Sequence, residues 1–193
     1  MLTKPRLPAD DLLADIEDAG FERLAAAGFR RYEVSAFARN GYECRHNRNY
    51  WEFGDYLALG AGAHGKVTQA DGTILRYRKT RLPRDYLLLS PATRQAKVSG
   101  FARVDGGNPF TVESAVVAAG ELPFEFMLNA LRLVDGVPRA LFARRTGLAD
   151  EAIVAAVAGL RERGLLVDDD SRLACTGTGL RFLNDVLDAF LPP

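Results

Sequence analysis

Both histidines of the chain, its only tryptophan and one of its two cysteines lie between residues 44 and 64. The first chemical cluster in this segment is HNRNYW, residues 46–51. The imidazole of His46 can be an axial ligand of haem iron, and the flat rings of Tyr50 and Trp51 can stack on a porphyrin. The pattern therefore favours a site for a large, flat, apolar ligand.

The residues beside these rings allow two interpretations. Asn47 and Asn49 could bond a haem propionate or hold the loop, while Arg45 and Arg48 add positive charge suited to propionates. Cys44 is a second candidate ligand of the iron. The alternative is structural, because single histidines seldom bind metal. In that case the two rings fill the edge of a core and the imidazole is only hydrogen-bonded.

A second cluster is GAGAHG, in which Gly60, Gly62, Ala63 and His64 follow one another closely. Small residues let a backbone approach a ligand, as at the edge of a cofactor. The alternative is the tight end of a buried strand, with glycine at the bend. His64, close to Lys66, could be functional or could cap the turn.

The composition excludes several kinds of protein. Twenty-five basic residues balance twenty-five acidic ones among 193 residues, so no net charge is available to hold a phosphate backbone. The two cysteines form neither a CxxC pair nor a CxxxCxxC triplet, and the histidines lack the HxxxH spacing of a zinc site. No apolar run reaches the ~18 residues that a membrane span needs. We therefore expect a cytoplasmic protein that binds no nucleic acid and has no membrane span.

The first half of the chain predicts five elements. A helix is followed by an alternating strand, a polar loop, a short buried strand that enters a glycine turn, and a hairpin about Asp71-Gly72. A helix that leads into a strand is half of a parallel α/β unit, so we expect an α/β fold here. The ranges of the five elements are 10–27, 29–39, 40–56, 55–65 and 66–77.

The C-terminal part has the pattern of a winged helix, with three helices, two short strands about a DDDS turn and a closing helix. The exposed face of its third helix is mixed in charge and lacks a set of side chains that reads base edges, which favours protein docking over DNA binding. A change in composition between residues 90 and 112 predicts two domains, 1–105 and 106–193. The predicted elements span 122–133, 137–147, 149–163, 164–175 and 176–191.

Three motifs of this sequence resemble those of one known family, the HemW haem chaperones and the related oxygen-independent coproporphyrinogen III oxidases. They are a YE-S-FA strand, an HNxxYW motif and a glycine-rich G-GAH segment, and the tail from PFEFMLNALRL onward is also similar. The matching positions are Tyr32, Glu33, Ser35, Phe37 and Ala38, then His46, Asn47, Tyr50 and Trp51, then Gly60, Gly62, Ala63 and His64.

The resemblance implies a radical S-adenosylmethionine fold, of which this chain holds the C-terminal half. The expected architecture is α/β plus α+β, with the last strands and helices of a partial (β/α) barrel before a winged-helix-like domain. In the full-length family a CxxxCxxC loop holds a 4Fe-4S cluster and S-adenosylmethionine, and nothing in this chain matches that loop. We therefore expect no catalytic residue and no enzymatic activity from this chain unaided.

The resemblance also assigns roles to the two clusters. It implies that His46, Asn47, Tyr50 and Trp51 hold haem, with His46 as the candidate iron ligand, and that the G-GAH segment is one wall of the S-adenosylmethionine pocket in the intact family. The expected function is that of a truncated HemW-like protein that binds haem and passes it to apo-proteins. Two alternatives stay open. One is half of a coproporphyrinogen oxidase that needs a cluster domain from another chain, and the other is a winged-helix docking module.

Overall fold

The structure is a computed structural model that describes residues 8–88, 108 and 110–192. These residues form a mixed α/β fold without a closed barrel, and each of its three sheets pairs antiparallel strands. The predicted division at residues 105 and 106 lies outside the described residues. No helix in the part of the chain that the structure describes is long and apolar enough to cross a membrane.

The chain begins with the predicted helix, α1 (Asp10–Ala26). Gly28 follows with a φ of 81°, a left-handed conformation that ends the helix as expected. The helix contacts the strand at residues 36–38 through Phe21, whose ring centroid lies 5.5 Å from that of Phe37. Apart from Phe21 and the half-buried Leu24, its apolar residues are exposed, and no residue of the helix is fully buried.

The predicted strand over 29–39 is wrong, because the structure divides it into β1 (Arg30–Glu33) and β2 (Ala36–Ala38). The two strands pair antiparallel. The turn between them is held by the Glu33 carboxylate, which accepts hydrogen bonds from the backbone N–H and the hydroxyl of Ser35, both at 2.9 Å. The chain therefore reverses here, and the expected half of a parallel α/β unit is not formed.

The predicted loop over 40–56 is also wrong, since residues within it form the helix α2 (Arg45–Trp51). An ion pair between Arg48 and Glu52, 2.7 Å apart and four residues along, stabilises this short helix. The predicted buried strand over 55–65 is not formed either. Gly60 and Gly62 have positive φ angles, 94° and 70°, which interrupt an extended backbone.

The hairpin about Asp71-Gly72 is confirmed. It pairs β3 (His64–Thr68) with β4 (Ile74–Lys79), and β5 (Thr111–Val116) adds a third strand on the other side of β4. In this register His64 faces Arg78 and Lys66 faces Arg76 across the pair. The short helix α3 (Pro83–Leu88) follows β4.

The C-terminal helices form broadly where the apolar spacing predicts them, with two differences. At 164–175 the two predicted strands of the wing are joined by a bridge between Leu166 and Cys175. Residues 172–173, in the second of these predicted strands, pair with residues 137–138, which precede the second of the C-terminal helices. The closing helix is divided at Phe182, whose ψ of 38° is not helical. The elements are the 3-10 turn η2 (Ala119–Glu121), α4 (Leu122–Ala130), β6 (Val137–Pro138), α5 (Ala140–Thr146), α6 (Glu151–Glu162), β7 (Arg172–Leu173), α7 (Gly177–Arg181) and α8 (Leu183–Asp188).

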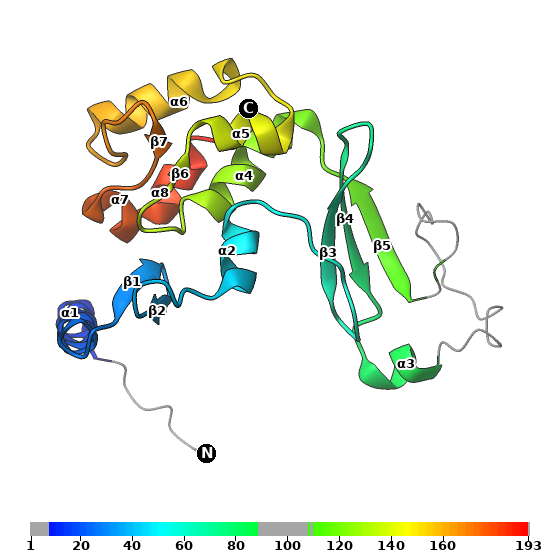
Figure 1. Cartoon of the computed structure of the whole chain (residues 1–193), viewed down its shortest axis with the longest axis horizontal. Coiled ribbons are helices and arrows are strands. Elements are labelled where there is room, and N and C mark those ends of the chain that lie inside the picture. The colour runs from blue at the N-terminus through cyan, green and yellow to red at the C-terminus, as the bar shows by residue number, and fades with distance from the viewer. Residues whose placement is uncertain (1–7, 89–107, 109, 193) are drawn as a thin grey trace.

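Figure 1 shows how these elements are arranged. Helices α4 to α8 gather together, α2 lies beside α4, α1 and the β1–β2 pair lie beyond one side of α2, and the β3–β4–β5 sheet lies beyond the other. A row of buried aromatic rings joins these parts. The centroid of Phe126 on α4 lies 5.6 Å from that of Phe53, just after α2, and 5.3 Å from that of Phe142 on α5.

This row predicts a large loss of stability in Phe126→Ala, because Phe126 is fully buried between two other rings. We expect the free energy of unfolding to fall by about 3–5 kcal/mol, measured by urea denaturation. Phe182→Ala is the matched control, since that ring is 55% exposed, and it should cost well under half as much. Equal losses in the two variants would contradict the placement of this core.

Candidate functional site

The candidate site is built on α2, and its inner face is attached to β1. Asn47 donates a hydrogen bond of 3.1 Å from its side-chain nitrogen to the hydroxyl of Tyr32, which is buried. The asparagine side chain therefore faces the protein and holds the helix in place. Of the two roles that the sequence left open for Asn47, the structure shows the attachment.

A buried carboxylate lies behind the helix. Glu33 is only 2% exposed, and besides its two hydrogen bonds from Ser35 it accepts one of 3.1 Å from the guanidinium of Arg132. That guanidinium also lies over the ring of Trp51, 4.4 Å from the centroid. The guanidinium of Arg132 thus connects Glu33 and Trp51, although the three residues are far apart in the sequence.

The outer face of α2 presents His46 to solvent. Its ring meets that of Tyr50, one turn later, edge to face at 4.7 Å, and Tyr50 in turn lies 4.1 Å from Tyr56. Among the described residues the imidazole of His46 has no hydrogen bond or ion pair. The imidazole is therefore not committed to a protein hydrogen-bond partner among these residues, and the ring is supported from one side by another aromatic ring.

The two arginines on α2 differ in how they are engaged. The guanidinium of Arg48 donates to Glu52 from two of its nitrogens, at 3.1 and 2.7 Å. Arg45 is exposed and forms no ion pair or hydrogen bond through its side chain within the described residues. Of these two arginines, Arg45 is therefore the one whose guanidinium is not already paired in the described part of the chain and could bind an anionic group near His46.

A second anchor holds the C-terminal end of α2 to the β3–β4–β5 sheet. Lys66 is 2% exposed, and its ammonium lies 2.9 Å from the carboxylate of Asp55 and 4.2 Å from the centroid of the Phe53 ring. Asp55 also accepts hydrogen bonds from the N–H and hydroxyl of Thr68. Burial raises the pKa of Asp55, but these hydrogen bonds outweigh it and leave the pKa below its ordinary value.

The turn after α2 needs particular residues. Phe53 is buried and has a φ of 54°, which is uncommon for a residue with a side chain. At Gly54 an added Cβ would lie 2.1 Å from the side-chain oxygen of Asn49 and 2.8 Å from its carbonyl oxygen, so the position admits only glycine. Asn49 itself donates to the carbonyl of Asp55 at 2.9 Å, which is a structural role.

The glycine-rich segment packs on the end of β4. Gly62 donates to the carbonyl of Thr80 at 2.8 Å, and the carbonyl of Ala63 accepts from the N–H of Lys79 at 2.8 Å. Both glycines, Gly60 and Gly62, have the left-handed backbone conformation that favours glycine and that turns the chain toward β4. The segment ends at His64, which is exposed at the start of β3.

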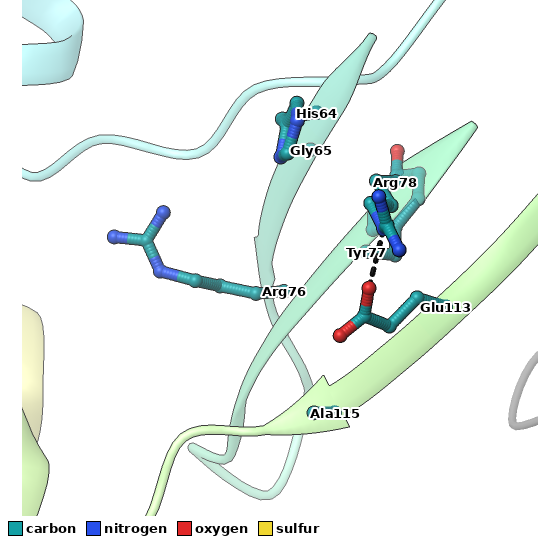
Figure 2. A pocket seen from close by; sticks show the side chains of 7 residues that line it. All are labelled: His64, Gly65, Arg76, Tyr77, Arg78, Glu113 and Ala115. Atoms are coloured by element: carbon teal, nitrogen blue, oxygen red, sulfur yellow. Dashed lines mark hydrogen bonds and ion pairs between the residues drawn. The ribbon is translucent and has the colours of Figure 1, made fainter. Parts of the chain in front are cut away.

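His64 borders two hollows. The first has a volume of about 280 Å³, and its lining includes Arg76, Ala115 and the paired side chains of Arg78 and Glu113 (Figure 2). The second has a volume of about 260 Å³ and is lined by Gly62, His64, Arg78, Lys79 and Arg81. Neither is lined by His46, so the two sequence clusters do not share either hollow.

The two cysteines do not fit an iron–sulfur cluster. Cys175 is buried, and burial raises the pKa of its thiol to about 12, so it stays protonated. Cys44 is exposed next to α2. No group of three or more histidine, cysteine and acidic side chains within the described ranges could hold a metal ion.

Two parts of the site are missing from the sequence-based prediction. Arg132 carries no local signal, because it comes 99 residues after its partner Glu33. The Asp55–Lys66 pair had a partial signal: Lys66 and Thr68, which both bind Asp55, stand two apart on a predicted strand and so share one face.

Comparisons with known proteins identify relatives of this chain. The family model for the HemN C-terminal domain matches residues 117–182. The haem chaperone HemW of Escherichia coli (strain K12) is 40% identical over 97% of this chain and 44% of its own length. HemW of Haemophilus influenzae is 37% identical over the same shares, and HemW of Mycobacterium tuberculosis (strain H37Rv) is 35% identical over 93% of this chain and 39% of its own.

The fold is similar to a solved structure, that of coproporphyrinogen III oxidase (HemN) from Escherichia coli, a radical SAM enzyme. The TM-score is 0.61 and the match covers 95% of this chain and 42% of that one, but only 14% of residues are identical, so the likeness is one of fold. The chain matches the C-terminal half of the HemW family and spans less than half the length of these relatives.

The anchor at Asp55 predicts a pH-dependent stability. Because its folded pKa lies below the ordinary value of 3.8, the carboxylate stabilises the fold above that pH and the benefit is lost as pH falls through the folded pKa. We expect the free energy of unfolding of wild type to exceed that of Asp55→Asn by about 1 kcal/mol near pH 7. The difference is modest because the side chain of Asp55 is partly exposed. The difference should become smaller as the pH falls below 3.8 and through the folded pKa of Asp55, as urea unfolding over a pH series would show.

The control for this series is Asp188→Asn, which changes an exposed carboxylate without an ion pair among the described residues. The free energy of unfolding of Asp188→Asn should differ little from that of wild type near neutral pH. A gap for Asp55→Asn that stays constant from neutral to acid pH would contradict the role of this carboxylate.

Proposed function

We propose that this chain, which matches the C-terminal half of the HemW family, binds haem through His46 and releases it to an apo-protein. The observation that carries the proposal is the exposed imidazole of His46, which has no partner among the described residues and is supported by Tyr50 on a helix held to the core. A neutral imidazole with an accessible nitrogen is a common ligand of haem iron.

The surroundings of His46 support binding of the rest of the haem. Tyr50 and Tyr56 offer aromatic surface beside the imidazole, and Arg45 offers an unengaged cation for a propionate. Since the helix is exposed on this side, bound haem would bury less apolar surface than in a closed pocket. Less buried area means weaker retention, which suits a protein that passes its cargo on.

The other half of the family's chemistry is not supplied by this chain. Its two cysteines do not fit an iron–sulfur cluster, so we derive no reaction from such a group. We propose that Gly60, Gly62, Ala63 and His64 contribute one wall of a cofactor pocket in the intact family. Support comes from the exposed position of His64 beside two hollows.

For the C-terminal part we propose a winged-helix-like domain, residues 106–193, that docks to protein. Support comes from the order of its helices and from the β6–β7 pair beside the Leu166–Cys175 bridge, which together resemble a short wing. Two of the arginines there are engaged: Arg139 pairs with Asp150, and Arg161 with Asp170. This arrangement leaves less positive charge for a phosphate backbone, which favours docking over DNA binding.

The first test of haem binding is titration of the purified chain with haemin, followed by the Soret band. We expect His46→Ala to weaken binding by at least about tenfold and to shift the band, because the axial nitrogen is lost. His64→Ala, which changes the other histidine of the chain, should leave both unchanged.

The two histidine variants also show how the proposal would fail. If His46→Ala binds haemin as wild type does, the imidazole is not the ligand. If His64→Ala alone removes the band, the ligand lies at the start of β3 and the proposed site is wrong.

A second test uses the difference between the two arginines of α2. We expect Arg45→Ala to weaken haemin binding by a few fold, because an unengaged cation near a propionate is lost. Arg48→Ala removes the same charge from the same helix, but its guanidinium is already paired with Glu52, so its effect should be smaller. The reverse order of the two dissociation constants would contradict the assignment of Arg45.

A further inference from the structure

We infer that Arg132 is a positioning residue for the ring of Trp51, and that through it the C-terminal region controls the shape of the haem-binding segment. The inference rests on the proposed function, because it concerns the same segment. Arg132 belongs to the range that matches the HemN C-terminal domain, whereas Trp51 ends α2.

The contact between the two residues is close and has a defined geometry. The guanidinium carbon of Arg132 lies 4.4 Å from the centroid of the Trp51 ring, within the range of a cation–π interaction. The same guanidinium donates to Glu33 at 3.1 Å and to the hydroxyl of Ser35 at 3.2 Å. The guanidinium is thus held by Glu33 and Ser35 at the β1–β2 turn, and it lies over the ring of Trp51.

Trp51 has no polar anchor of its own among the described residues. Its indole nitrogen is buried and has no hydrogen-bond partner there. The neighbouring ring of Tyr50 lies 6.4 Å away at an angle of 52°, which is a looser contact than that with Arg132. The indole also packs against the hydrophobic core, so the guanidinium of Arg132 is the polar group that adds to this packing in orienting the ring.

The backbone of Arg132 is fixed as firmly as its side chain. Its carbonyl accepts a hydrogen bond of 3.0 Å from Val34, and the carbonyl of Tyr32 accepts one of 3.1 Å from Val134. These bonds join the residues after α4 to β1, with a bridge between Glu33 and Leu133. The position of the guanidinium over Trp51 is therefore set by the folding of the C-terminal region against β1.

Arginine suits this role and lysine does not. A guanidinium is planar, so it can stack on a ring and bond a carboxylate along its edge at the same time, whereas an ammonium is a compact charge. Arg132→Lys keeps the positive charge that the buried Glu33 requires and removes the planar contact with Trp51. The substitution thus separates the positioning role from the charge balance.

The experiment uses the full chain, in which Trp51 is the only tryptophan, so intrinsic fluorescence reports on this ring alone. We expect Arg132→Lys to shift the emission, to raise quenching by acrylamide, and to weaken haemin binding by about tenfold, as loss of a well-placed cation–π contact implies. Arg161→Lys is the matched control, with the same change at a partly buried arginine that binds Asp170, and it should change neither readout.

A second variant keeps the test decisive if Arg132→Lys folds poorly. Ser35→Ala removes one of the two side chains that hold the guanidinium, together with one hydrogen bond to Glu33, and leaves the ion pair between Arg132 and Glu33. It should therefore shift fluorescence and haemin affinity in the same direction but by less. Thermal melts of all variants, compared with that of wild type, show whether each chain is folded when it is titrated.

The outcomes separate this inference from the proposed function. Unchanged fluorescence and unchanged haemin affinity in folded Arg132→Lys would overturn the inference, and so would a shifted emission with unchanged affinity. If wild type and His46→Ala bind haemin alike, the proposed function fails, while the fluorescence series still decides whether Arg132 holds the indole.

Discussion

The structure depends on a carboxylate that is almost wholly removed from water. Glu33 is 2% exposed, and a buried charge is tolerated only when it is paired and hydrogen-bonded. Ser35 supplies two hydrogen bonds, which fold the chain back between β1 and β2, and Arg132 supplies the opposite charge. Removing one partner of such a pair costs about 3–5 kcal/mol. The need to pair and hydrogen-bond Glu33 therefore fixes both the β1–β2 turn and the packing of the C-terminal region against β1.

The same requirement places α2. The inner face of the helix is attached through Asn47 and Trp51 to Tyr32 and Arg132. The turn after its C-terminal end is attached through the Asp55–Lys66 pair to the three-stranded sheet. A helix of seven residues has little stability of its own in water, so these attachments account for its order. The result is a rigid inner face with His46 on the open side, where a large planar ligand can approach.

Sequence patterns predict the C-terminal helices and the β3–β4 hairpin, but not the short strands, the helix and the turns between residues 29 and 65. The helices of the C-terminal part follow their apolar spacing, and the Asp71-Gly72 turn locates the β3–β4 hairpin. Alternation over 29–39 could not reveal the β1–β2 turn, because that turn depends on the buried Glu33, and seven residues are too few for a helical period to show α2. The residue types of the HNRNYW cluster pointed to haem, but which arginine is engaged follows only from contacts in space.

One residue after α2 holds a backbone shape that it does not favour. Phe53 keeps its left-handed φ because its ring is packed against Phe126 and beneath the ammonium of Lys66, and a glycine there would relax the chain while losing both contacts. The joint between helix and sheet is therefore maintained by side-chain packing instead of by backbone preference. A change that loosens this packing therefore also loosens the attachment of α2 to the three-stranded sheet.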